Sequence, residues 1–221
     1  MKKKYLFAEF IILFAFFILP PLFVFPKNQT LTFSTFPLSA SLRAVIAALL
    51  YLQFKSEKSE NSFFYISKTL EWSALTLGFL MLIFTFFEFF SIFFLKENLN
   101  ATNVPSLPST FIEWIFVILT FLFGAFYEEV LYRLYLPQIL KIFLFPTFNE
   151  KTKNKENLLI EIPPILIFAL AHRYLGWIGV FNAASSAFIL RICFLKTKNI
   201  FAGTFSHFLY NFLLFLFAVL I

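Results

Sequence analysis

Apolar residues form seven long runs along the chain, and short polar segments separate these runs. A helix needs about 20 predominantly apolar residues to cross the hydrocarbon core of a bilayer, and most runs approach or exceed that length. The pattern therefore predicts an all-α fold, a polytopic transmembrane helix bundle of about seven spans. The expected spans are approximately Tyr5–Phe25, Leu38–Phe54, Trp72–Leu95, Phe111–Phe145, Leu158–His172, Gly176–Leu195 and Ile200–Ile221.

Prolines and polar residues mark the expected ends of these spans. Pro20-Pro21 is predicted to kink or end the first span, and Pro163-Pro164 to kink the fifth, because proline lacks the N–H that a helix interior needs. The polar connections are predicted at Lys27–Pro37, Lys55–Lys68, Lys96–Thr110, Asn149–Asn157 and Lys196–Asn199.

The fourth apolar run is too long for a simple crossing. A straight helix over Phe111–Phe145 would extend about 50 Å, whereas the hydrocarbon core is about 30 Å thick. Part of the run must leave the core or turn. Pro137 is the predicted place, with Gln138–Phe145 lying at the membrane interface.

Composition supports a membrane protein. Of the 221 residues, 60% are hydrophobic and 14% are charged, and the mean hydropathy is +0.84, far more apolar than a soluble domain. Cys193 is the only cysteine, which excludes an internal disulfide and a cysteine-based metal cluster.

The net charge of +6 reflects membrane topology rather than a nucleic-acid partner, because the lysines fall in short runs between apolar segments. Cytoplasmic flanks carry the excess of Lys and Arg. With a cytoplasmic N-terminus, 14 of the 18 basic residues lie on the cytoplasmic side, although Arg133 and Arg191 fall partly within apolar runs. The basic residues expected outside are Lys27, Arg43, Lys96 and Arg173.

The fourth run contains two adjacent carboxylates and an arginine. Ionisable groups at membrane depth cost several kcal/mol unless they are paired or hydrated, so they indicate a functional site. Glu129 and Arg133 have the i, i+4 spacing that allows an intrahelical ion pair. Glu128 is rotated about 100° away and is expected to be the freer carboxylate.

Both histidines of the chain lie in apolar runs. His172 ends the fifth run, and His207 shares a helical face with Asn211 through i, i+4 spacing. Each polar group alone is compatible with a structural role, such as an interhelical hydrogen bond. Three spans that each carry polar residues at one-turn spacing together favour a site in which Glu128 and an imidazole activate water.

These residues resemble the motifs of the CPBP family, the CAAX proteases and bacteriocin-processing enzymes, also called the Abi family. The motifs read Glu128-Glu129-x-x-x-Arg133, Phe168-x-x-x-His172 and His207-x-x-x-Asn211. The resemblance covers about residues 111–220. It suggests N-terminal transmembrane helices at residues 1–110, about three spans, and a catalytic helical core at residues 111–221.

The resemblance implies a glutamate-type intramembrane endopeptidase without a cofactor. Glu128 and His172 would activate the attacking water, His207 and Asn211 would donate hydrogen bonds to the oxyanion, and Glu129 and Arg133 would support the site. The expected substrate is a membrane-associated peptide or protein, reached from the cytoplasmic side of the lipid bilayer. A prenylated CAAX C-terminus, a leader peptide and a sorting-tail protein all remain open.

Two other functions remain open. Two glutamates and two histidines could bind zinc, although the chain lacks His-Glu-x-x-His. The polar cluster could also hold together a non-catalytic membrane protein of the bacteriocin-immunity or scaffold type. The first motif departs from the family at Tyr132, where phenylalanine is common, and at Leu134, where glycine is common.

The predicted depths of the two catalytic groups disagree. His172 would lie about 21 Å from the cytoplasmic start of its helix, whereas a turn at Pro137 would leave Glu128 only a few helical turns from the cytoplasmic end of its span. The two side chains meet only if the fourth helix continues past Arg133 or the Pro163-Pro164 segment enters the membrane late.

Overall fold

Helices account for almost all of the described chain in the computed structural model, which describes residues 3–24, 32–54, 62–95, 105–145 and 153–220. No strand occurs within these ranges, which confirms the predicted all-α fold. The helices are α1 (Lys3–Leu13), continued by a π-helical turn (Phe14–Ile18) and a 3₁₀ turn (Pro20–Phe23), α2 (Leu38–Phe54), α3 (Ser62–Phe90) with a π-helical turn (Ser91–Leu95), α4 (Phe111–Glu129), the π-helical turn η4 (Val130–Tyr135), α5 (Leu136–Leu144), α6 (Lys153–Ala171), a 3₁₀ turn (Arg173–Leu175), α7 (Gly176–Thr197) and α8 (Ile200–Leu220).

Among the described residues, five helical segments are long and apolar enough to cross a membrane. Two further apolar helices within the described ranges are shorter, at Leu38–Phe54 and Leu158–Ala171. The predicted number of about seven spans is not confirmed, and the prediction of a transmembrane helix bundle agrees with the five candidate spans. They are Lys3–Phe23, Ile66–Phe94, Phe111–Leu144, Arg173–Thr197 and Ile200–Leu220.

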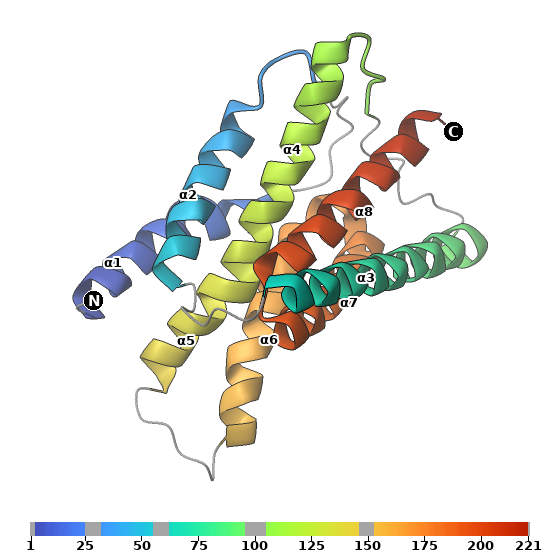
Figure 1. Cartoon of the computed structure of the whole chain (residues 1–221). Coiled ribbons are helices and arrows are strands. Elements are labelled where there is room, and N and C mark those ends of the chain that lie inside the picture. The colour runs from blue at the N-terminus through green and yellow to red at the C-terminus, as the bar shows by residue number, and fades with distance from the viewer. Residues whose placement is uncertain (1–2, 25–31, 55–61, 96–104, 146–152, 221) are drawn as a thin grey trace.

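The fourth helix does not turn at Pro137 as predicted. The helical path continues from α4 through η4 into α5 and ends at Leu144. Pro137 lies in the first turn of α5, where the fixed φ of proline suits a helix. The long helix therefore extends well beyond Arg133, and Figure 1 shows α5 leading on from the end of α4.

Two helices also begin earlier than their hydrophobic patterns indicate. α3 starts at Ser62, inside the predicted connection Lys55–Lys68, and α6 starts at Lys153, inside the predicted connection Asn149–Asn157. Lysine and glutamate are good helix formers, so a helix can extend past its apolar stretch. The predicted start at Phe111 is confirmed. The N-cap residue Thr110 accepts a hydrogen bond from the N–H of Glu113, as is typical of a helix N-terminus, and the Glu113 carboxylate accepts one from the N–H of Ser109.

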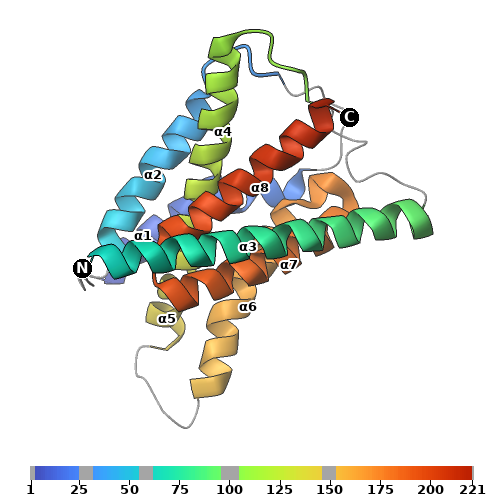
Figure 2. The same cartoon turned by 45° about the vertical axis from the view of Figure 1, so that its right-hand side comes forward.

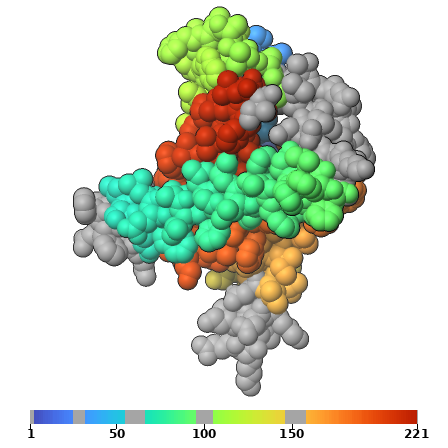
Figure 3. Space-filling model, turned by 90° about the vertical axis from the view of Figure 1, so that its right-hand side faces the viewer, coloured from blue at the N-terminus to red at the C-terminus, as the bar shows by residue number. Residues whose placement is uncertain are grey.

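The helices pack around η4. α2 runs along α4 and η4, α8 packs on α4, and α6 packs between α5 and α7. α3 lies across α7 and α8 (Figure 2) and covers one face of the molecule (Figure 3). All six residues of η4 are buried, so the π-helical turn forms the centre of the bundle.

The N-terminal helices share this core. Leu6, Leu13, Ile18, Ala47 and Leu50 belong to the same hydrophobic cluster as the apolar residues of η4. Residues 1–110 therefore pack directly on residues 111–221, and the division into two parts at residue 110 stays a prediction.

Candidate active site

Glu129 and Arg133 form the buried ion pair that their spacing predicts. The Nε atom of Arg133 lies 3.4 Å from Oε2 of Glu129, and both side chains are almost completely buried. The pair joins the last turn of α4 to η4. A π-helical turn is rare and often marks a functional site, and here it follows directly after the two glutamates.

Glu128 is the more accessible of the two carboxylates. Its side chain is 26% exposed, whereas that of Glu129 is fully buried, and its Oε2 atom lies 3.6 Å from Nε2 of His207. The structure therefore agrees with the expectation that Glu128 is the freer acid.

His207 connects the two glutamates, which the sequence did not predict. Its Nδ1–H donates a 3.0 Å hydrogen bond to Oε1 of Glu129, and its Nε2 faces Glu128. Because the Glu129 carboxylate also pairs with Arg133, it holds the imidazole in one orientation. Asn211, half-buried, lies one turn further along α8.

Gly203 permits the contact between α4 and α8, and sequence reasoning missed it. A Cβ atom at this position would lie 2.7 Å from Oε2 of Glu129, much closer than a carbon atom can approach. The available signal was its place one turn before His207 in a chain with only five glycines.

His172 lies in the turn that follows α6. Its Nδ1–H donates a 2.8 Å hydrogen bond to the backbone carbonyl of Phe168, so the Nε2 atom of the neutral ring carries the free lone pair. Its imidazole interacts electrostatically with Glu128, His207 and Arg133. Gly176, with φ of 80°, lets the chain turn sharply into α7.

The long fourth helix removes the predicted conflict of depth. Glu128 lies about 24 Å along the helix from Leu144, and His172 lies about 28 Å from Lys153, at 1.5 Å per residue. Leu144 and Lys153 are the two helix ends that flank residues 145–152, and α5 packs on α6. The two groups therefore reach a similar level because the helix continues past Arg133.

Phe168 forms an aromatic platform among the polar groups. The Arg133 guanidinium lies 4.4 Å from the centre of its ring, and the rings of Tyr132, His172 and His207 lie 5.2, 4.5 and 6.0 Å away. A cation on an aromatic face is stabilised most when both are removed from water. Phe168 thus ties the end of α6 to η4 and α8.

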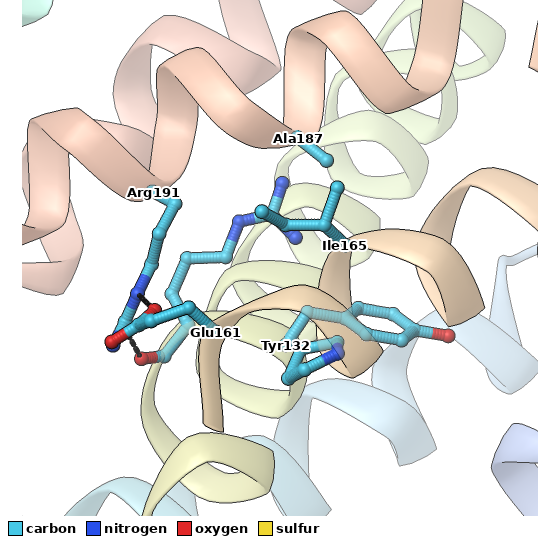
Figure 4. A pocket seen from close by; sticks show the side chains of 7 residues that line it. Tyr132, Glu161, Ile165, Ala187 and Arg191 are labelled. Carbon is cyan, nitrogen blue, oxygen red and sulfur yellow. Dashed lines mark hydrogen bonds and ion pairs between the residues drawn. The ribbon is translucent and has the colours of Figure 1, made fainter. Parts of the chain in front are cut away.

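A second charged pair lies beside η4. Arg191 of α7 binds both carboxylate oxygens of Glu161 of α6 and donates to the backbone carbonyl of Arg133. Figure 4 shows this pair at a narrow pocket also lined by Tyr132, Ile165 and Ala187. The charge distribution of the sequence placed Arg191 among the cytoplasmic residues. Its position inside an apolar run was the signal that its side chain has a buried partner.

Both histidines of the cluster use Nδ1 for a protein oxygen. This leaves their Nε2 atoms for a proton or a metal ion. Within the described residues, however, no group of three or more His, Cys, Asp or Glu side chains is placed to hold a metal ion.

The cluster has the parts that general acid–base hydrolysis needs. It contains an accessible carboxylate, two imidazoles held by hydrogen bonds through Nδ1, and a buried ion pair that orients one of them. A carboxylate and an imidazole at such a site can take a proton from water and pass it on.

Comparison with known families agrees with this chemistry. Residues 110–213 match the family described as Type II CAAX prenyl endopeptidase Rce1-like. No curated protein and no solved structure matches the chain. The matched residues include all three motifs and run from the N-cap of α4 into α8. The C-terminal region of the chain, residues 110–213, therefore belongs to the Rce1-like family of type II CAAX prenyl endopeptidases, as its resemblance to the CPBP family implies.

Proposed function

We propose that this chain is a glutamate-type intramembrane endopeptidase that hydrolyses a peptide bond of a membrane-associated protein or peptide. The observation that carries the proposal is the different environment of the two adjacent glutamates. Glu129 is buried and paired with Arg133 and His207. Glu128 is partly exposed and faces the other side of the same His207 imidazole. Membership in a family of CAAX-type intramembrane proteases supports the same class of reaction.

Glu128 and His172 activate the attacking water in this proposal. The hydrogen bond from His172 Nδ1–H to the Phe168 carbonyl keeps a lone pair on Nε2, so the ring can accept a proton. The water oxygen attacks the carbonyl carbon, its proton passes to Glu128 or His172, and the same proton then reaches the leaving amine as the C–N bond breaks. The products are a carboxylic acid, which keeps the second proton of the water, and an amine; transfer of that proton between them gives a carboxylate and an ammonium group.

His207 and Asn211 are the proposed oxyanion donors. Nδ1–H of His207 donates to Glu129, and Nε2 can donate to the developing oxyanion when it carries a proton. Asn211 offers an amide N–H₂ one turn away on the same face. Removal of one such donor typically slows an enzyme about 10²–10³-fold.

The site is proposed to work without a metal ion. Among the described residues, no group of three or more His, Cys, Asp or Glu side chains lies close enough together to hold one. A chelator tests this directly. Activity that survives the chelator supports the proposal, and activity that disappears and returns with zinc supports a zinc-dependent protease instead.

The proposed orientation has a cytoplasmic N-terminus and a site reached from the cytoplasmic side, as the distribution of Lys and Arg indicates. The proposed substrates are membrane-anchored, and the family description suggests a prenylated CAAX C-terminus first. Leader peptides and sorting-tail proteins are the other classes to compare.

The experiment is a cleavage assay with the full chain in liposomes. An internally quenched, farnesylated CAAX peptide serves as substrate, and mass spectrometry identifies the products. Glu128→Gln is expected to abolish cleavage, whereas Glu71→Gln, at an exposed glutamate of α3, keeps wild-type activity. A biological effect that survives both Glu128→Gln and His172→Ala in folded protein would instead support a non-catalytic membrane protein.

A further inference from the structure

The backbone carbonyl of Arg133 cannot receive the hydrogen bond that an α-helix would give it. In an α-helix this oxygen accepts a hydrogen bond from the N–H of the residue four positions later, but residue 137 is a proline and has no N–H. Arg133 and Pro137 are both buried. Without this bond, a buried carbonyl takes its donor one residue further along the helix, as in a π-helical turn, or from a side chain elsewhere in the fold.

Arg191 supplies that donor from α7. Its Nη1–H donates to the carbonyl oxygen of Arg133, and its Nε–H and Nη2–H donate to the two oxygens of Glu161. A planar guanidinium can serve several acceptors at once in a fixed geometry, and Figure 4 shows Arg191 and Glu161 directed toward one another. One buried side chain thus joins η4, α6 and α7.

The residue whose carbonyl is bound is also the residue that positions the site. The Arg133 side chain pairs with Glu129, and Glu129 holds the Nδ1 atom of His207. A displacement of the Arg133 backbone would therefore move the Glu129 carboxylate and the His207 imidazole, whose Nε2 faces Glu128.

We propose that Arg191 is a positioning residue that replaces the N–H removed by Pro137 and, with Glu161, holds η4 in the register that brings Glu129 to His207. The proposal rests on the proposed function, which assigns hydrolysis to Glu128 and the two histidines. Arg191 itself touches neither substrate nor the reacting atoms.

The first test compares Arg191→Met with Lys196→Met, which removes a cation from the exposed face of the same helix. Arg191→Met is expected to lower kcat about 10²-fold with little change in KM, because small misplacements of catalytic groups cost about that much. Arg191→Lys, with a single donor group, should give an intermediate kcat. A wild-type kcat in folded Arg191→Met protein would overturn the proposal.

The second test restores the missing N–H. Pro137→Ala provides a backbone donor four residues after Arg133, so the double variant Pro137→Ala/Arg191→Met is expected to regain at least tenfold of the lost kcat. A structural role for Arg191 unrelated to this carbonyl would leave the double variant no better than Arg191→Met. If Arg191→Met alone does not fold, Pro137→Ala is expected to restore its folding, and failure to do so counts against the proposal.

The third test does not depend on catalysis. The chain has only two histidines, so ¹⁵N-labelled histidine gives two sets of imidazole resonances, assigned with a His172→Asn variant. Arg191→Met is expected to shift the His207 signals, and Pro137→Ala to move them back. If these shifts occur but the wild-type protein cleaves no substrate, Arg191 positions His207 as proposed and the proposed function fails. If the His207 signals do not change in an active protein, the positioning role of Arg191 is contradicted.

Discussion

The buried hydrogen bond between His207 and Glu129, 3.0 Å from Nδ1 to Oε1, joins α8 to the last turn of α4. It gives the two adjacent glutamates different tasks. Glu129 is committed to His207 and Arg133 inside the bundle, and Glu128 keeps an accessible oxygen facing the other side of the same imidazole.

Replacement of the two glutamates by glutamine is predicted to separate stability from activity. Glu129→Gln leaves the buried Arg133 without its counter-charge, and removal of one partner of a buried pair costs about 3–5 kcal/mol. Glu128→Gln should keep the stability and lose the general base. Thermal unfolding in detergent checks this, and an equal loss of stability in both variants would contradict the assignment.

A methyl group at Gly203 is predicted to disrupt the site. The added Cβ of Gly203→Ala would lie 2.7 Å from Oε2 of Glu129, so α8 or the carboxylate must move, at a cost of about 1–3 kcal/mol. The matched control is Gly124→Ala in α4, where a Cβ meets nothing within 4 Å and alanine favours the helix. Unfolding curves and cleavage rates of the two variants should differ, and equal behaviour would count against the close approach.

Loss of the aromatic ring at Phe168 is predicted to loosen Arg133. Phe168→Leu keeps an apolar side chain but removes the face on which the guanidinium lies, an interaction worth about 2 kcal/mol in a dry site. Phe188→Leu, at an exposed position of α7, is the control. The comparison measures melting temperature and kcat, and a wild-type kcat in Phe168→Leu would show that the ring does not position the site.

His172 is predicted to act through Nε2 while Nδ1 serves only to orient the ring. His172→Asn can still donate to the Phe168 carbonyl but has no group at the Nε2 position. Its melting temperature is expected to stay near that of the wild type, and cleavage to fall about 10²–10⁴-fold, as for loss of an acid–base group. Substantial cleavage by this variant would remove His172 from the mechanism.

The proposed orientation predicts which residues an impermeant thiol reagent reaches. Cys193 is the only cysteine and is buried, so Cys193→Ala provides a background for single cysteines. In intact cells, Leu107→Cys should be labelled, and Lys4→Cys should be labelled only after permeabilisation. The opposite pattern would reverse the topology.

The sequence by itself determined the features that depend on local periodicity. Long apolar runs specify helices of the observed type, and the i, i+4 spacing of Glu129 and Arg133 is sufficient for their ion pair because both lie on one helical path. The start of α4 at Phe111 likewise follows from a local cap. The same reasoning placed a turn at Pro137, whereas the helix continues there and a side chain from α7 binds the Arg133 carbonyl, which Pro137 cannot serve.

Only the tertiary structure decided which polar groups meet. The contacts of His207 with Glu129, Arg191 with Arg133, and Gly203 with Glu129 join residues far apart in the chain, and their formation depends on how the helices cross and at what level. Spacing along one helix contains no information about that crossing. The sequence therefore supplied the proposed members of the site, whereas helix packing paired His207 with Glu129 and left Glu128 accessible.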